Sequence, residues 1–125
     1  MALAAPAITK VHPVASASAA SYTRRGYTVV ETSLSAVVGV DGLPDPTLLV
    51  ADMGVAECVL EDRVDPARMI PAIEALASEG WEVTVLVPAP RMGAAHWGLR
   101  GTPAMLQAWW PGPSDSIQFG APQVP

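Results

Sequence analysis

Three charged residues in the middle of the chain could support metal-assisted chemistry. Asp45 precedes one apolar stretch, and Glu61 and Arg63 end the next. Side chains two positions apart on a strand share a face, so Glu61 and Arg63 are expected to point the same way. If Asp45 lies on the adjoining strand, its carboxylate converges with that of Glu61, and hard oxygen ligands of this kind suit Mg²⁺. An ion held there could activate a water for attack on a phosphodiester.

The motifs Pro44-Asp45 and Glu61-Asp62-Arg63 stand in a predicted element order of helix, three strands, helix and strand. This combination resembles the PD-(D/E)XK, or restriction-endonuclease-like, superfamily over roughly residues 14–87. That family has a Pro-Asp at the start of one strand of a hairpin and a Glu-x-Lys at the end of the next. The resemblance implies a Mg²⁺-dependent nuclease that acts on DNA phosphodiesters. Its catalytic residues would be Glu31, Asp45, Glu61 and Arg63, with Asp45 and Glu61 as the metal ligands.

One substitution and the charge of the chain disfavour that activity. Arg63 stands in place of the lysine, and a guanidinium stays protonated at any working pH, so it cannot act as a base. The chain has a net charge of −5, and ten of its twelve acidic residues lie between Asp41 and Glu82. A nucleic-acid partner is disfavoured because phosphate contacts need clustered Lys and Arg. The alternative is that residues 61–65 are a solvated strand end followed by a helix cap.

The two ends of the chain predict contacts with other proteins. Trp109 and Trp110 are adjacent, so on a strand one indole faces inward and the other outward. Tryptophan is enriched at binding hot spots, and the proline-rich tail 111–125 has too little apolar surface to fold alone. We therefore expect a non-catalytic accessory or assembly subunit that binds protein partners, or further copies of itself, through its terminal arms. The alternative is a tail that folds back over its own tryptophan.

The pattern of apolar residues predicts one small α/β domain over residues 1–125. Its core covers about residues 14–110, between an N-terminal arm at 1–13 and the C-terminal tail. We expect a small mixed sheet with flanking helices: a helix at 12–25, strands at 27–32 and 35–40, a β-hairpin at 47–63, a helix at 65–79, a strand at 81–87, a helix at 92–100 and an edge strand at 104–110. Pro71 either kinks its helix or marks the point where the regular helix begins.

A receiver-like, doubly wound arrangement is the second fold that this order allows. Asp52 ends an apolar strand and is followed by helix, strand, helix and edge strand, as that fold requires. A phosphoacceptor site also needs an acidic pair, a hydroxyl and a lysine after other strands. The corresponding positions read Lys10-Val11-His12, Pro88-Ala89 and Trp109-Trp110. A domain of this type would therefore be inactive in signalling.

Cysteine usage and hydropathy indicate a cytoplasmic protein. The one cysteine, Cys58, lies in an apolar run, which predicts a buried free thiol in a reducing compartment. No apolar stretch approaches the roughly 20 residues that a membrane helix needs, so no membrane partner is expected. No cofactor is expected either, apart from the Mg²⁺ that the nuclease alternative would require.

Overall fold

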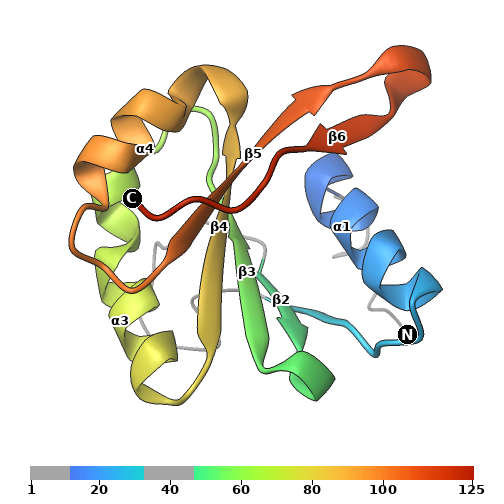
Figure 1. Ribbon diagram of the computed structural model, residues 1–125, viewed down its shortest axis with the longest axis horizontal. Helices are drawn as coiled ribbons and strands as arrows, with labels where there is room; N and C mark the ends of the chain where they lie inside the picture. The colour runs from blue at the N-terminus through green and yellow to red at the C-terminus, as the bar shows by residue number, and fades with distance from the viewer. Residues whose placement is uncertain (1–11, 33–46) are drawn as a thin grey trace, which may run out of the picture.

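The computed structural model describes residues 12–32 and 47–125, and their strands form one six-stranded sheet (Figure 1). The strands lie side by side in chain order: β1 (Val30–Thr32), β2 (Thr47–Val50), β3 (Val55–Val59), β4 (Glu82–Pro88), β5 (Met105–Pro111) and β6 (Ile117–Phe119). The pairs β3–β4 and β4–β5 are parallel, and the other three pairs are antiparallel. The mixed α/β sheet with a β2–β3 hairpin is thus as predicted. The receiver-like arrangement is wrong, because that fold has a parallel sheet whose strand order departs from chain order.

Helices cover both faces of this sheet. α1 (Pro13–Arg24) lies on one face, while α3 (Ile70–Ser78) and α4 (Met92–Gly98) lie together on the other (Figure 1). On the α3/α4 face, Ile73 and Leu76 pack against buried apolar side chains of β3, β4 and β5. On the α1 face the buried group is smaller and consists of Val14, Ala15, Leu48, Val59 and Leu86.

The residues of β3 alternate between these two faces. Ala56 and Cys58 belong to the core under α3 and α4, whereas Val59 belongs to the core under α1. Glu57 lies between Ala56 and Cys58 and therefore points toward α1. The period of two thus places one carboxylate inside the protein, on a strand whose other side chains are apolar.

Turn and capping residues set the limits of the elements between β2 and β4. Gly54 ends the short 3₁₀ helix η3 (Ala51–Met53) with φ of 68°, a conformation that favours glycine. Asp65 caps the 3₁₀ helix η4 (Pro66–Met69) by accepting a hydrogen bond from the Ala67 N–H at 3.0 Å. The regular helix α3 begins only at Ile70, next to Pro71. This confirms the prediction that Pro71 marks the point where the regular helix begins.

The hairpin is shorter than predicted. β3 ends at Val59, and the Leu60 N–H still donates to the Leu86 carbonyl of β4 at 3.0 Å before the chain leaves the sheet. The predicted strand extended to residue 63, and this is wrong, because the next residues form the turn that leads to the Asp65 cap. β4, α1 and α4 lie within two residues of their predicted limits.

The C-terminal tail packs on its own domain. β6 pairs with β5, so β5 is an interior strand and its prediction as an edge strand is wrong. Two further links hold the chain beyond β6: the Gly120 N–H donates to the Ala108 carbonyl at 2.9 Å, and Leu106 and Gln123 exchange two backbone hydrogen bonds of 2.7 Å. Residues 111–125 are therefore not a free arm, and the tail folds back as the alternative reading expected.

Some predictions fall outside the described residues, namely the N-terminal arm up to residue 11, the strand at 35–40 and the position of Asp45. Within residues 12–32 and 47–125, no helix is long and apolar enough to span a membrane.

Candidate functional site

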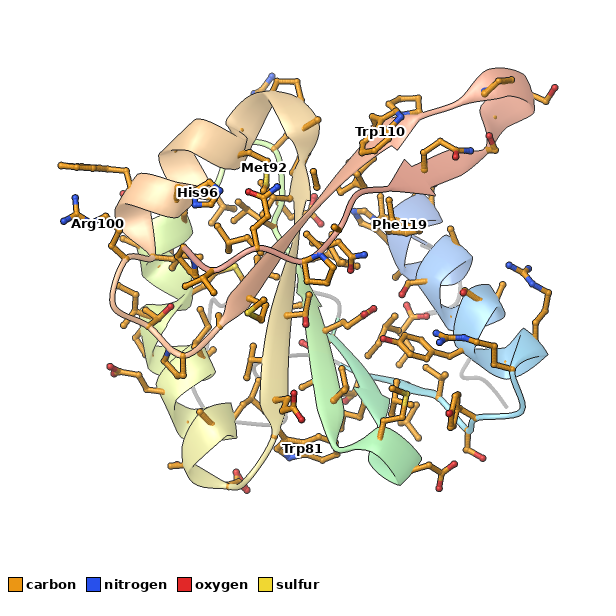
Figure 2. All side chains as sticks on the ribbon, in the orientation of Figure 1. Trp81, Met92, His96, Arg100, Trp110 and Phe119 are labelled. Atoms are coloured by element: carbon orange, nitrogen blue, oxygen red, sulfur yellow. The ribbon has the colours of Figure 1, made fainter. Side chains whose placement is uncertain are left out.

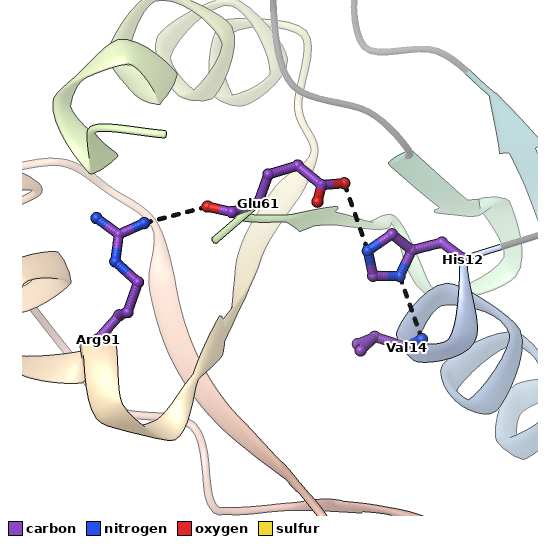
Figure 3. Close-up of polar contacts among 4 residues, drawn as sticks. All are labelled: His12, Val14, Glu61 and Arg91. Atoms are coloured by element: carbon purple, nitrogen blue, oxygen red, sulfur yellow. Dashed lines mark hydrogen bonds and ion pairs between the residues drawn. The ribbon is translucent and has the colours of Figure 1, made fainter. Parts of the chain in front are cut away.

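The structure separates the residues that the nuclease resemblance selects. Glu61 and Arg63 lie in the turn after β3, so the expectation that they share a strand face is wrong. Arg63 is exposed, and Glu61 faces His12 at the start of α1, with 3.4 Å between Oε1 and Nε2 (Figure 3). Glu31 lies on β1, the outermost described strand on its side of the sheet. Asp45 is outside the described residues, so its distance from Glu61 stays a prediction.

Glu57 is an acidic residue that sequence reasoning missed. It is 4% exposed, and both of its carboxylate oxygens accept hydrogen bonds from α1: Oε1 from the Ser18 hydroxyl, and Oε2 from the Tyr22 hydroxyl at 2.7 Å. Burial, and next the hydrogen bond to Glu57, raise the pKa of Tyr22 well above its ordinary value. The signal in the sequence was a single acid at an alternating position inside an apolar strand.

The register of the sheet places Glu57 and Glu31 in one row. Glu31 pairs with Leu48, and Leu48 pairs with Glu57, so the two acids face the same side with β2 between them. Two strand spacings separate them by roughly 10 Å. Val59, two residues after Glu57 on the same face, occupies the place where a Glu-x-Lys motif would have its lysine.

A small cavity of about 160 Å³ adjoins the buried Glu57. Arg25 lies beside it with its guanidinium carbon 4.7 Å from the centre of the Tyr22 ring. Gln107 also lines the cavity, but its amide donates to the Gly120 carbonyl at 2.8 Å. Ser18, Tyr22 and Glu57 are hydrogen-bonded to one another, so this cluster joins α1 to the sheet.

A larger cleft of about 320 Å³ lies beyond the carboxyl ends of β3 and β4. The start of α1 and the β5–β6 hairpin complete its walls, so segments from both ends of the described chain meet there (Figure 1). We call this site the carboxyl-edge cleft; it is lined by His12, Pro13, Val14, Leu60, Glu61, Asp62, Pro88, Trp109 and Ile117.

His12 has a structural part in this cleft. Its Nδ1 accepts a hydrogen bond from the Val14 N–H at 3.2 Å and so caps α1. An imidazole that accepts at Nδ1 carries its proton on Nε2, which here faces the Glu61 carboxylate (Figure 3). Both ring nitrogens are therefore occupied, and in this arrangement neither is available as a general base.

Arg91 holds the acidic wall of the cleft in place. It follows β4, and its Nη1 donates to the backbone carbonyls of Glu61, Asp62 and Val64 at 3.1, 2.8 and 2.8 Å. Figure 3 shows Arg91 and His12 approaching Glu61 from opposite sides. The guanidinium thus fixes the backbone of the turn and leaves the Glu61 side chain, 44% exposed, facing His12.

The two adjacent tryptophans point in opposite directions, as predicted. Trp109 packs against the core under α1, and its indole N–H is buried with no hydrogen-bond partner in the described part of the chain. Trp110 is 41% exposed on the β5–β6 hairpin (Figure 2). A third indole, that of Trp97 on α4, is 74% exposed and stacks with Arg100 at 4.7 Å.

Within residues 12–32 and 47–125, no three side chains of His, Cys, Asp or Glu are grouped so that they could hold a metal ion. The geometry that the described residues do offer is a walled cleft with an aromatic side, an acidic side and a fixed backbone. No protein-family model, curated protein or solved structure matches this chain.

Proposed function

We propose that this protein is a non-catalytic binding module that receives a segment of a protein partner in the carboxyl-edge cleft. The observation that carries this proposal is the cleft itself, about 320 Å³ between the start of α1 and the β5–β6 hairpin. Its volume lies in the range of small-ligand sites, which are mostly apolar with a few placed polar groups. The proposal moves the partner contact from the tail to the cleft that the tail helps to build.

The walls of the cleft suit binding more than acid–base chemistry. Trp109, Pro88 and Ile117 supply apolar surface, and His12 has both nitrogens engaged. The three hydrogen bonds of Arg91 fix the turn beside the cleft, and a wall that is already fixed lowers the entropic cost of binding. The exposed Trp110, on the opposite face of β5 from Trp109, adds surface outside the cleft of the kind enriched in hot spots.

Selection from a random peptide display library tests this function with a matched pair of variants. Ile117→Trp fills the cleft from β6, whereas Gln118→Trp adds the same indole at an exposed position of the same strand. We expect selected peptides to bind the wild-type protein and the Gln118→Trp variant but not the Ile117→Trp variant. Peptides that bind all three proteins equally, or no selected peptide at all, would refute the function.

A Mg²⁺-dependent nuclease is the second candidate. The observed order α1, β1, β2, β3, α3, β4 supports it, because the resemblance rests on that order. The row of Glu31 and Glu57 supplies two acids on one face, while Val59 and the acidic charge of the chain oppose it. A plasmid-nicking assay with Mg²⁺, comparing the wild-type protein with Glu57→Gln and Glu61→Ala, would decide. Nicking at equal rates by all three proteins would exclude Glu57 and Glu61 as catalytic residues.

A further inference from the structure

We propose that the carboxyl-edge cleft recognises an arginine side chain of the partner. This inference rests on the proposed binding function and names the chemistry that the cleft selects. Two acidic residues, Glu61 and Asp62, line the cleft, and no lysine or arginine is among the lining residues that the structure describes. A site of that charge favours a cationic ligand.

The carboxylates are accessible to such a ligand. The Glu61 side chain is 44% exposed and its Oε1 is paired with His12, while Asp62 is exposed beside it. A guanidinium presents several N–H donors in one plane and pairs with carboxylates through two parallel hydrogen bonds. The Arg91 guanidinium binds the backbone carbonyls of the turn from the side away from His12 (Figure 3).

The apolar walls fit the rest of an arginine. Its three methylenes can lie along Pro88 and Ile117, which line the same cleft as the two acidic residues. Trp109 offers an indole, and tryptophan is the aromatic side chain that attracts a guanidinium most strongly. The cleft therefore matches both the apolar stem and the cationic head of an arginine side chain. It would match neither a simple anion nor a purely apolar ligand as well.

An NMR titration of the ¹⁵N-labelled full chain tests the inference. The probe is N-acetyl-L-arginine amide, and the control is N-acetyl-L-citrulline amide, which has nearly the same shape without the charge. We expect saturable shifts at the Trp109 indole N–H and at the amides of Glu61 and Asp62 with the arginine probe. We also expect binding at least about tenfold weaker with citrulline, because the charge-assisted pair is lost.

Charge-neutralising variants complete the test. Glu61→Gln and Asp62→Asn should each weaken the arginine probe by roughly fivefold to tenfold, whereas Glu74→Gln, an exposed acid on α3, should leave its affinity unchanged. Asp62 is exposed, so its variant stays informative if Glu61→Gln disturbs the α1 cap. Equal affinity for citrulline, shifts confined to residues outside the cleft, or no effect of either variant would overturn the inference.

The two proposals fail in different ways. Cleft-dependent peptides that contain no arginine would leave the binding function standing and overturn the arginine inference. An arginine probe that binds in the cleft, together with a display selection that yields no cleft-dependent peptide, would support the arginine site and refute the partner-binding function.

Discussion

Replacing Tyr22 with phenylalanine removes one hydroxyl from the buried contact between α1 and β3. That hydroxyl donates to Glu57 Oε2 at 2.7 Å, and Glu57 is only 4% exposed, so water cannot easily replace the lost donor. A hydrogen bond to a charged group stabilises a protein by about 1.5–3 kcal/mol. The ring itself stays, and with it the edge contact to Tyr27 at 6.4 Å. We therefore expect Tyr22→Phe to lower the free energy of unfolding by roughly 2 kcal/mol.

Urea denaturation followed by far-UV circular dichroism measures this change, and a double-mutant cycle assigns its cause. In a Glu57→Leu background the hydroxyl has no carboxylate to meet, so Tyr22→Phe should there cost less than about 0.5 kcal/mol. Tyr27→Phe is the matched control and should stay within about 0.5 kcal/mol of the wild-type protein. An equal cost of Tyr22→Phe in both backgrounds would refute the reasoning.

The pH dependence of the same variant supplies an independent check. The pKa of Tyr22 is raised by burial and by Glu57, so the folded protein holds the phenolic proton more tightly than the unfolded chain. The stabilisation is complete below the ordinary tyrosine pKa of 10.0 and is lost as the pH rises toward the folded value. From neutral pH to about pH 10 the advantage of the wild-type protein over Tyr22→Phe should therefore be constant, and it should shrink at higher pH.

Three further predictions concern the core, the thiol and the turn. Ile73→Ala, at a fully buried position of α3, should lower the free energy of unfolding by about 2–5 kcal/mol. Glu74→Ala, at the exposed neighbouring position, should change it by less than about 0.5 kcal/mol. Equal effects of the two substitutions in urea titrations would contradict the packing described. Burial raises the pKa of the Cys58 thiol to about 12, so near neutral pH a disulfide reagent should label the folded protein far more slowly than the urea-unfolded chain. Equal labelling rates would contradict this prediction. Arg91→Met removes three hydrogen bonds to the turn, so the Val64 amide should exchange its hydrogen faster with solvent while the amides of β4 stay protected. Unchanged exchange at Val64 would show that the turn does not depend on Arg91.

Local signals in the sequence predicted most of the elements. The β-branched run of β4 and the limits of α1 follow from propensity and from Pro13 and Gly26 at the two ends of the helix. Pro71 limited where α3 could begin, since its ring is tolerated only in the first turn of a helix. Such features depend on neighbouring residues alone, and this is why a single sequence reveals them.

The site could not be predicted in the same way, because it depends on contacts between distant segments. The predicted strand ran from Ala56 through Glu61 to Arg63, yet the chain turns after Val59 toward the Asp65 cap. Glu57 owes its burial to Ser18 and Tyr22, which lie more than 30 residues earlier in the chain. The carboxyl-edge cleft likewise needs the start of α1 beside β6, a pairing that no periodicity encodes.

The two outermost strands among the described residues bear on how the protein behaves at high concentration. β1 and β6 are each three residues long, so each edge presents few free backbone groups to a second molecule. The middle residue of β1 is Glu31, and two copies joined edge to edge would bring these carboxylates close together. Short edges and like charge both oppose the growth of a continuous sheet between molecules. Glu31, which sequence motifs suggested as an active-site acid, thus lies where its charge opposes pairing between two copies of β1.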